Sequence, residues 1–431
     1  MKSKHKNEIE IMSPAGDFSS MMSALNAGAN SVYFGIEGLN MRAKSSNNFT
    51  IYDLEEIAKR CSEYNANSYM TVNTVIYDDD LELMRKIIDS AKSAGITAVI
   101  GADQAVIGYC NSVDMPLHIS TQANISNIEA IKFYSMFSDV MVLARELSLE
   151  QISEIYNEIK KQNIRGPLGE LIRLEVFVHG ALCMAISGKC YLSLHHTTKS
   201  ANRGECTQQC RKAYTVKEKG SDNELEIDNQ YIMSPKDLCT IEFIDEIINA
   251  GASVLKIEGR GRSPEYVKRT TECYKEAVDL YLKDEYTDEN KLRLKKKLEE
   301  VFNRGFWGNY YLGGKLGEWT DKPGSKATKK KVYLGKVTNY FAKIGVAEFK
   351  IESQELKQNT EVLIIGPTTG TIETKAQDIR NIELESVEVV KKGEVFTFAV
   401  NEKVRKNDEL YKLVPGGQIP EKRYRLNART N

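Results

Sequence analysis

The sequence predicts an α/β fold, a TIM-like (β/α) barrel followed by a small antiparallel β-barrel domain. Up to about residue 165, short β-branched or aromatic runs alternate with amphipathic helical segments, which is typical of a parallel sheet built from β/α units. Short motifs of one such unit recur in a second unit 221 to 223 residues further along the chain, which favours a closed ring. After residue 332 the pattern changes to period-two strands separated by turns.

Nine segments have the composition of barrel strands, although an eight-stranded barrel needs only eight. Either one of them is not a strand, or one strand lies outside the barrel. The nine segments are residues 8–13, 31–36, 68–73, 97–102, 117–121, 139–144, 173–179, 230–234 and 253–259.

Two β/α units are expected to share one construction. Ile-Met-Ser-Pro begins at Ile11 and again at Ile232, and Asn-Ala-Gly-Ala begins at Asn26 and again at Asn249. In each unit we expect a strand, a helix that stops at the Ala-Gly pair, and a second strand.

The chain is predicted to contain two domains, because 431 residues suit a barrel of roughly 250 to 320 residues plus a smaller unit. Helical patterns continue from Pro264 to about Val301, and a Gly-rich segment then leads to a linker with five lysines between Lys322 and Lys331. We place the barrel domain at residues 1–320, with a cysteine-containing insertion at 175–215, and the small domain at 321–431. Its strands are expected at 332–341, 344–351, 361–367, 393–400 and 409–414.

Composition restricts the class of protein. A hydrophobic content of 41% with 28% charged residues is ordinary for a globular protein, and no apolar run approaches the roughly 20 residues that span a bilayer. The amino-terminal segment lacks the apolar core of a secretory signal, so we expect a cytoplasmic protein without a membrane partner. The net charge of −1 argues against general coating of nucleic acid. The net charge divides into −7 for residues 1–320 and +6 for the remainder. The lysines of the linker are explained by solvation more readily than by an anionic partner.

Four of the eight cysteines fall within 28 residues, at Cys183, Cys190, Cys206 and Cys210, after the predicted strand 173–179. Reducing cytosol disfavours disulfides, and barrel enzymes place their chemistry at the carboxyl ends of strands. The spacings of six, fifteen and three intervening residues lack the tight paired knuckles of zinc sites and suit an iron-sulfur cluster better; zinc and unligated thiols remain alternatives. The other cysteines in helical or apolar patterns, Cys61, Cys110 and Cys273, are expected to be packed in the core.

The run from Glu175 to Ser193 closely resembles the signature of the collagenase-like peptidase family of unassigned mechanism (peptidase family U, number thirty-two). The resemblance covers most of residues 9 to 320. Further matching segments are Ser13–Gly16, Met41–Ala43, Ser120–Gln122, Arg145–Leu147, Asn202–Gly204, Ser234–Cys239, Glu258–Arg260 and Asn303–Phe306.

The order of the domains is similar to that of the tRNA hydroxylation members of this family. That resemblance implies an enzyme with a 4Fe-4S iron-sulfur cluster that converts the wobble uridine of tRNA to 5-hydroxyuridine, with prephenate as the oxygen donor. It implies Cys183, Cys190 and Cys206 as cluster ligands, and for the fourth we favour Cys239 over Cys210. It implies tRNA as a partner and leaves room for a paralogous second subunit.

Polar residues at successive strand ends are the further candidates for the site. We expect catalytic roles for Arg145, Glu146, His179 and Glu258. Prephenate is a dicarboxylate, so arginine forks should bind it, and the candidates are Arg42, Arg203 and Arg260 together with Arg145. Tyr33, Phe34 and Tyr191 are candidate platforms for an unstacked base.

Two other classes of function compete with this interpretation. The sequence has neither an H-E-x-x-H nor a G-x-S-x-G motif, so a peptidase would need a Cys-His pair, for which Cys183 and His179 are the candidates. A non-catalytic RNA-binding or assembly protein would explain the basic linker and the small barrel, but not the polar strand ends.

Overall fold

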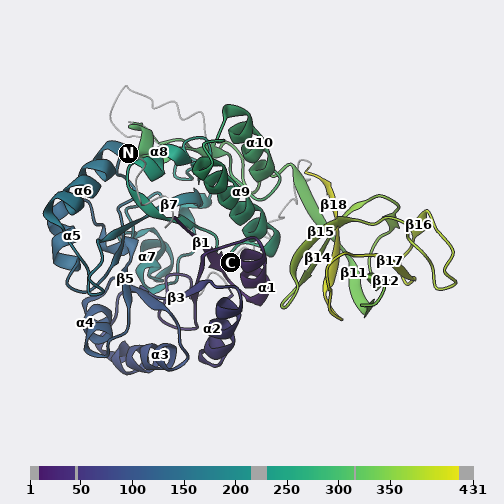
Figure 1. Cartoon of the computed structure of the whole chain (residues 1–431), viewed down its shortest axis with the longest axis horizontal. Helices are drawn as coiled ribbons and strands as arrows, with labels where there is room; N and C mark the ends of the chain where they lie inside the picture. The colour runs from purple at the N-terminus through teal and green to yellow at the C-terminus, as the bar shows by residue number, and fades with distance from the viewer. Residues whose placement is uncertain (1–8, 44–46, 215–230, 315–316, 417–431) are drawn as a thin grey trace, which may run out of the picture.

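The computed structural model describes residues 9–43, 47–214, 231–314 and 317–416 of the chain. Its first part is a closed barrel of eight parallel strands (Figure 1), which confirms the predicted TIM-like architecture. The ring closes because β9 pairs in parallel with β1 on one side and with β7 on the other. The eight strands are β1 (Glu10–Ala15), β2 (Ser31–Gly35), β3 (Asn67–Val72), β4 (Ala98–Gly101), β5 (Leu117–Ile119), β6 (Val140–Val142), β7 (Arg173–Gly180) and β9 (Ala252–Ile257).

Helices surround the barrel and bury their apolar faces against it (Figure 1). In α2, for example, Leu54, Ile57 and Cys61 recur at helical spacing and are all buried. Helix α6 begins after the N-cap Ser148 and ends at Asn163, which adopts the left-handed conformation. The helices are α1 (Phe18–Asn26), α2 (Leu54–Glu63), α3 (Leu81–Ser93), α4 (Gln104–Ser112), α5 (Ile128–Tyr134), α6 (Leu149–Gln162), α7 (Leu192–Thr197), α8 (Ile244–Asn249), α9 (Pro264–Leu282) and α10 (Asp288–Glu299).

The strand predicted at residues 230–234 is wrong. Residues 231–233 form a turn, closed by a 2.9 Å hydrogen bond from Ser234 N to Tyr231 O, and residue 230 lies outside the described residues. A short strand follows instead, β8 (Asp237–Cys239), which is antiparallel to the end of β7 and parallel to β10 (Phe306–Trp307). Because β9 already pairs with β7, the ring has no position for a ninth strand, and the two echoed units differ in their first element.

The second domain is antiparallel, as predicted. Its six-stranded sheet has the order β15-β14-β18-β11-β12-β17, and β13 and β16 form a separate pair. Phe349, Phe396 and Phe398 stack in its core, with the Phe349 and Phe398 rings 4.7 Å apart. The strands are β11 (Lys329–Phe341), β12 (Val346–Ile351), β13 (Leu356–Lys357), β14 (Glu361–Gly366), β15 (Gly370–Lys375), β16 (Val389–Val390), β17 (Val395–Ala399) and β18 (Glu409–Pro415).

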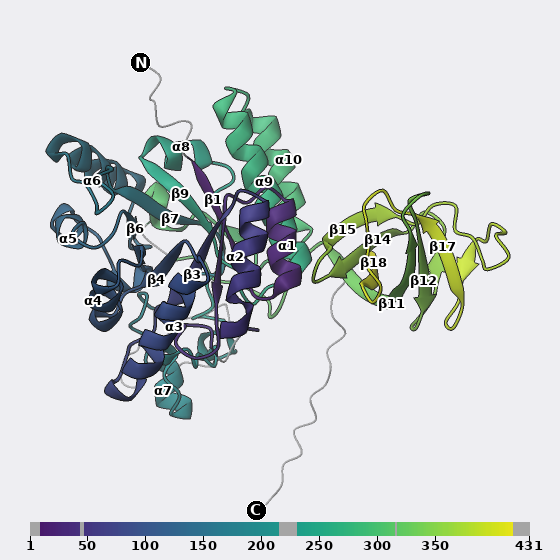
Figure 2. The ribbon, with the colours of Figure 1, turned by 60° about the horizontal axis from the view of Figure 1, so that its bottom comes forward.

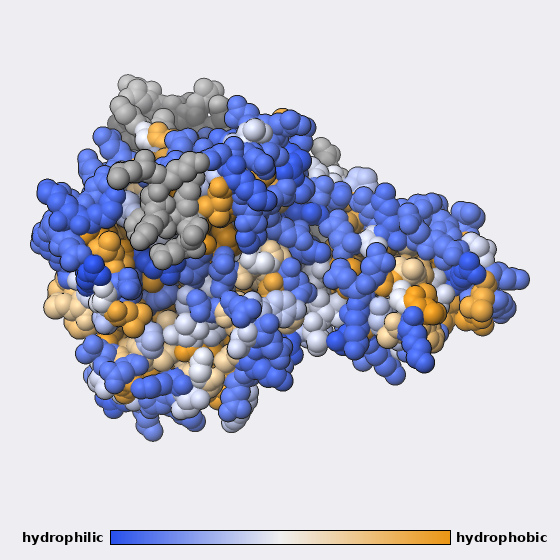
Figure 3. Space-filling model, in the orientation of Figure 1, coloured by the Kyte–Doolittle hydropathy of each residue, from blue (hydrophilic) through white to orange (hydrophobic). Residues whose placement is uncertain are grey.

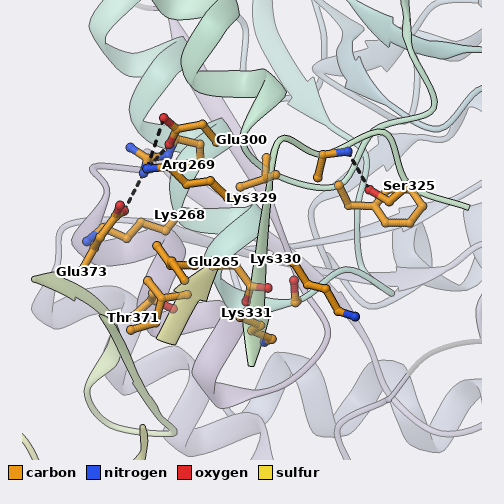
Figure 4. Close-up of a pocket in the computed structure, with 16 residues that line it drawn as sticks. Glu265, Lys268, Arg269, Glu300, Ser325, Lys329, Lys330, Lys331, Thr371 and Glu373 are labelled. Atoms are coloured by element: carbon orange, nitrogen blue, oxygen red, sulfur yellow. Dashed lines mark hydrogen bonds and ion pairs between the residues drawn. The ribbon is translucent and has the colours of Figure 1, made fainter. Parts of the chain in front are cut away.

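The hairpin of β14 and β15 packs against α1 and α9 and thereby joins the two domains. Ser23 Oγ lies 2.8 Å from Thr371 Oγ1, a buried hydrogen bond between α1 and β15. A cavity of about 220 Å³ lies at this junction, and Figure 4 shows Arg269 of α9 between two glutamates beside it. The contacts of Arg269 Nη2 are 3.3 Å to Glu300 and 2.5 Å to Glu373 of β15.

The surface toward the viewer in Figure 3 is mainly hydrophilic, with apolar side chains in small separate groups. Among the described residues, none of the helices combines the length and the apolar character that crossing a membrane requires.

Candidate active site

A cavity of about 280 Å³ lies at the carboxyl ends of the barrel strands. Residues 181–214, here called the lid, follow β7 and supply much of its wall. The lid contains α7, which projects beyond α3 in Figure 2. The strand ends supply the remaining wall, including Tyr33, Arg145, Phe177 and Glu258. This is the face at which barrel enzymes carry out their chemistry.

The four cysteines of the lid line this one cavity. Cys183 is exposed, and Cys190, Cys206 and Cys210 are half-buried. Burial raises the pKa of the Cys210 thiol, Arg211 lowers it, and the thiols of the other three raise it further. Burial likewise raises the pKa of Cys190, to which Cys183 and Cys206 add. The four thiols therefore lie close enough together for the charge on one to affect the pKa of another.

Cys239, which the sequence-based reasoning favoured over Cys210 as the fourth ligand, lies apart from this group, so its position does not support that preference. It lies in β8, is 5% exposed and is not part of the cavity wall. Burial raises the pKa of its thiol to about 12, and the charged side chains that act on it are Lys295 and Glu242. The turn at residues 231–233 and the antiparallel course of β8 place this thiol in the core.

His179 also belongs to the core, being 1% exposed. Its ring packs against Tyr266, Tyr274 and Phe306, and its Nδ1 lies 3.4 Å from Tyr274 Oη. Burial, with a smaller effect of Arg262, lowers its pKa to about 3, so the ring is neutral at neutral pH. His179 does not line the cavity, and its position supports neither the expected catalytic role nor a pair with Cys183.

Glu258 follows β9 and holds the positive charges of the cavity together. Its carboxylate accepts hydrogen bonds from Arg42 Nη2 at 2.9 Å and from Tyr33 Oη at 3.1 Å. Burial acts to raise its pKa, but Arg42 and Arg145, and then Arg260, lower it to about 2. Glu258 is therefore ionised at neutral pH and anchors cations rather than donating a proton.

Arg145 and Arg260 add positive charge to the same wall. The Arg145 guanidinium carbon lies 3.8 Å from the centre of the Phe177 ring, and its buried Nε has no hydrogen-bond partner within the described part of the chain. Arg260 donates to Thr71 Oγ1 at 2.8 Å and to Asn40 Oδ1 at 2.9 Å, and burial lowers its pKa to about 10. The wall thus carries more guanidinium charge than the carboxylate beside it can neutralise.

Comparison with known families matches the description peptidase family U32 to residues 16–321, which is most of the barrel and lid. The chain belongs to peptidase family U32. Family membership confirms the resemblance on which the sequence-based expectations rest.

Relatives of this U32 protein have names of two kinds. It is 55% identical over 407 residues to a collagenase of Porphyromonas gingivalis, covering 94% of this chain and 98% of that protein. It is 32% identical over 381 residues to a tRNA hydroxylation protein of Bacillus subtilis, covering 85% and 86%. It is 35% identical over 285 residues to a 23S rRNA 5-hydroxycytidine synthase of Escherichia coli, covering 64% and 40%.

Two further predicted site residues of the U32 chain, in addition to Cys239 and His179, lie outside the cavity. Arg203 forms a forked ion pair with Asp80, one contact being 3.2 Å, and lies 4.1 Å from the Tyr77 ring, so it fastens the lid to the loop after β3. Glu146 is exposed and does not line the cavity. Their positions do not support the expected roles in anion binding and catalysis.

Sequence reasoning missed Lys256, which lines the cavity from near the carboxyl end of β9. Its Nζ lies 2.6 Å from Glu175 Oε1 of β7 and 4.6 Å from the Tyr33 ring. Burial raises the pKa of Glu175, an effect that Lys256 opposes. A lysine in an otherwise apolar strand could have revealed this pair, because an inward-facing charge in a barrel needs a partner.

Arg211 was also missed. Its guanidinium donates to Ser234 Oγ at 3.0 Å, to Pro235 O at 2.8 Å and to Leu182 O, and so ties both ends of the lid to the turn before β8. Two of these acceptors are backbone carbonyls, which leave no pattern in the sequence.

Proposed function

We propose that this protein is an iron-sulfur-dependent RNA hydroxylase that converts the wobble uridine of tRNA to 5-hydroxyuridine with prephenate as the oxygen donor. One observation carries the proposal: four thiols and an arginine-rich wall line the same cavity at the barrel mouth. The relatives named as tRNA hydroxylation protein and rRNA hydroxycytidine synthase support RNA as the substrate.

The donor set fits a 4Fe-4S cluster held by Cys183, Cys190, Cys206 and Cys210. All four groups are thiols, which iron-sulfur clusters use as ligands. Among the described residues, no three His, Cys, Asp or Glu side chains are placed to hold a single ion, whereas a cluster several ångströms across needs ligands around a larger body. When bound there, it would supply electron-transfer chemistry beside the substrate.

The arginines fit a dicarboxylate. Prephenate has two carboxylates, and guanidinium forks bind carboxylates with matching geometry. Arg145 offers a buried donor that is unsatisfied within the described residues, and Arg260 is held rigidly by Thr71 and Asn40. The role of Arg42 is to position Glu258, whose charge keeps these cations together.

The proposal is tested with Cys183→Ala, and with Cys61→Ala of α2 as the matched control, since Cys61 is buried away from the cavity. We expect wild-type protein purified without oxygen to contain iron and sulfide, and a deletion strain to lose 5-hydroxyuridine from its tRNA by nucleoside mass spectrometry. The Cys61→Ala protein should contain iron and sulfide and should restore 5-hydroxyuridine to the tRNA of the deletion strain. The Cys183→Ala protein should do neither. Intact tRNA modification with Cys183→Ala would refute the proposal.

The collagenase names make proteolysis the second candidate. A cysteine peptidase needs a base beside its nucleophile, and the buried ring of His179 faces aromatic side chains instead. We therefore expect no release of peptides when wild-type protein is incubated with gelatin. Hydrolysis that disappears in Cys183→Ala but persists in Cys61→Ala would favour the peptidase.

A further inference from the structure

The cavity is small in relation to an RNA loop. A volume of about 280 Å³ cannot hold a length of RNA, so a target base must leave its stack to enter. The nucleotides on either side of that base remain outside, on the rim of the cavity. Much of that rim is formed by the lid.

The lid exposes apolar side chains in a short stretch: Met184 is 44% exposed, Ile186 55%, Tyr191 74% and Leu194 40%. Single exposed apolar residues are normal on a protein surface, but a group beside a cavity indicates a contact surface. Tyr191 presents most of its ring to solvent and lies next to Cys190, which lines the cavity.

The other two candidate aromatic platforms are not exposed to a flanking base outside the cavity. Tyr33 is 3% exposed, and its hydroxyl donates to Ile257 O at 3.0 Å and to Glu258. Phe34 is fully buried and packs edge-on against Phe49 with the ring centres 5.6 Å apart. Of the three, only Tyr191 is free to stack.

The lid is also a basic segment of an acidic domain. Residues 181–214 contain five Lys or Arg and one Glu, a net charge of +4, whereas the rest of residues 1–320 carries −11. Lys189, Lys199, Lys212, His195 and His196 are exposed. This concentration of positive charge complements a polyanion, and together with an exposed aromatic ring it is the combination that single-stranded nucleic acid requires.

Contacts with the barrel hold the lid in place. Asn124 Nδ2 donates to Ser187 O at 3.1 Å, and Val75 N donates to Asn202 O at 3.2 Å. Gly204 has a φ of +81°, and a Cβ there would lie 2.3 Å from Asn40 O, so only glycine allows this close approach. The exposed residues are thus presented on a fixed platform, which lowers the entropy lost on binding.

We propose that the lid is the surface that binds the single-stranded RNA flanking the target base, with Tyr191 stacked on a neighbouring base and Lys189 and Lys199 near its phosphates. This inference rests on the function proposed above and assigns the recognition of RNA to this barrel segment rather than to the lysine-rich linker.

The test measures binding of a fluorescently labelled 17-nucleotide stem-loop RNA, with uridine at the wobble position of its loop, to the full chain carrying its cofactor. Tyr191→Ala should weaken binding roughly tenfold or more, because a stacked base contributes substantially to affinity. Tyr191→Phe keeps the ring and should bind within about twofold of wild type. The matched control is Phe133→Ala on α5, an exposed aromatic that is 56% exposed and is not part of the lid.

A second variant reports stacking directly. Tryptophan fluorescence is sensitive to a stacked base, so Tyr191→Trp should show emission that the stem-loop RNA quenches. Equal affinity of Tyr191→Ala and wild type, or an absence of quenching in Tyr191→Trp, would overturn the assignment while leaving an RNA-binding hydroxylase intact. Wild-type protein that binds none of this RNA and leaves tRNA unmodified would overturn both proposals.

The contribution of Lys189 and Lys199 is measured separately, from the salt dependence of RNA binding. Removing phosphate contacts lowers the slope of log affinity against log salt by about 0.7 per contact for single strands. Lys189→Ala combined with Lys199→Ala should therefore flatten this slope, whereas Lys296→Ala, an exposed lysine of α10, should not change it. An unchanged slope in the double variant would exclude these two lysines from the RNA surface.

Discussion

Glu258 decides the electrostatic balance of the cavity, because it is the one carboxylate among the described residues that line it. Arg42, Arg145 and Arg260 all act on its charge. Without it, buried guanidinium groups would repel one another with no counter-charge, and an unpaired buried charge is far more costly than a missing neutral contact.

Glu258→Gln should therefore destabilise the protein by on the order of 3 kcal/mol at neutral pH, the energy of a pKa shift from 4.5 to about 2. Because the folded-state pKa is depressed, this contribution is present above about pH 4.5 and is lost as the pH falls towards 2. Urea unfolding of wild type and variant between pH 3 and 7 measures it. A difference in unfolding free energy that grows as the pH falls would contradict the assignment.

Cys210 and Cys239 can be separated experimentally. Cys210→Ala should lose most of its iron, whereas Cys239→Ala should keep the iron of wild type and lose only packing, because Cys239 is buried in β8 away from the cavity. Iron content of protein purified without oxygen measures both. Loss of iron in Cys239→Ala with retention in Cys210→Ala would restore the sequence-based choice.

At the scale of single residues, the sequence predicted which side chains could take part in chemistry better than it predicted where those side chains point. The four clustered thiols and Glu258 do reach one cavity, because they follow strand ends. Cys239 and His179 also follow or end strands, but the orientation of their side chains depends on the antiparallel pairing of β8 with β7. Such pairing between distant segments leaves no local pattern.

Strands β7 and β9 are joined inside the barrel by the ion pair of Glu175 and Lys256, whose side chains are 0% and 6% exposed. A buried pair of this kind contributes little net stability relative to an apolar pair of similar volume, but breaking it leaves an unpaired charge.

Lys256→Met should therefore destabilise the protein by about 3 to 5 kcal/mol, and adding Glu175→Gln should recover part of that loss. Lys295→Met is the control, because its partly exposed pair with Glu242 should contribute about 1 kcal/mol or less. Chemical denaturation at pH 7 measures all variants. Additive effects of the two barrel substitutions would show that the pair is not coupled.

At the scale of elements, periodicity found the eight barrel strands because each is a β-branched or aromatic run followed by a helix. The ninth candidate failed although it repeats Ile-Met-Ser-Pro of β1. The strand β1 forms because β2 and β9 flank it, whereas the copy at residues 232–235 makes, within the described residues, only a single antiparallel bridge between Pro235 and Trp319. Local sequence sets a preference for extended backbone, and neighbouring strands decide whether a strand forms.

At the scale of the whole molecule, charged residues can be counted from the sequence, but the partners with which they form ion pairs cannot be identified from it. The linker lysines have acidic partners: Lys326 pairs with Asp321, Lys329 with Glu361 at 3.0 Å, and Lys331 with Glu265 at 2.9 Å. Much of their charge is thus neutralised within the protein, which favours the lid over the linker as the proposed RNA-binding surface. The change to period-two strands predicted the second domain, but nothing in it indicated that β15 would dock on α1 and α9.

Arg269 links the two domains, because its guanidinium contacts Glu300 of the barrel domain and Glu373 of β15 (Figure 4). Its side chain is only 17% exposed, and the two carboxylates raise its pKa against the opposing effect of burial. Arg269→Met should weaken docking while each domain stays folded, giving faster protease cleavage between residues 321 and 328 and a larger radius of gyration by X-ray scattering.

The control for domain docking is Arg293→Met, whose ion pair with Glu276 at 2.6 Å joins α10 to α9 within the barrel domain. It removes a charge of the same kind without touching the junction, so it should leave cleavage and scattering unchanged. High salt should move wild type towards Arg269→Met, since screening weakens partly exposed ion pairs. If wild type and Arg269→Met are cleaved at equal rates, the buried hydrogen bond of Ser23 with Thr371 and the packing of β15 on α1 are sufficient to hold the domains together.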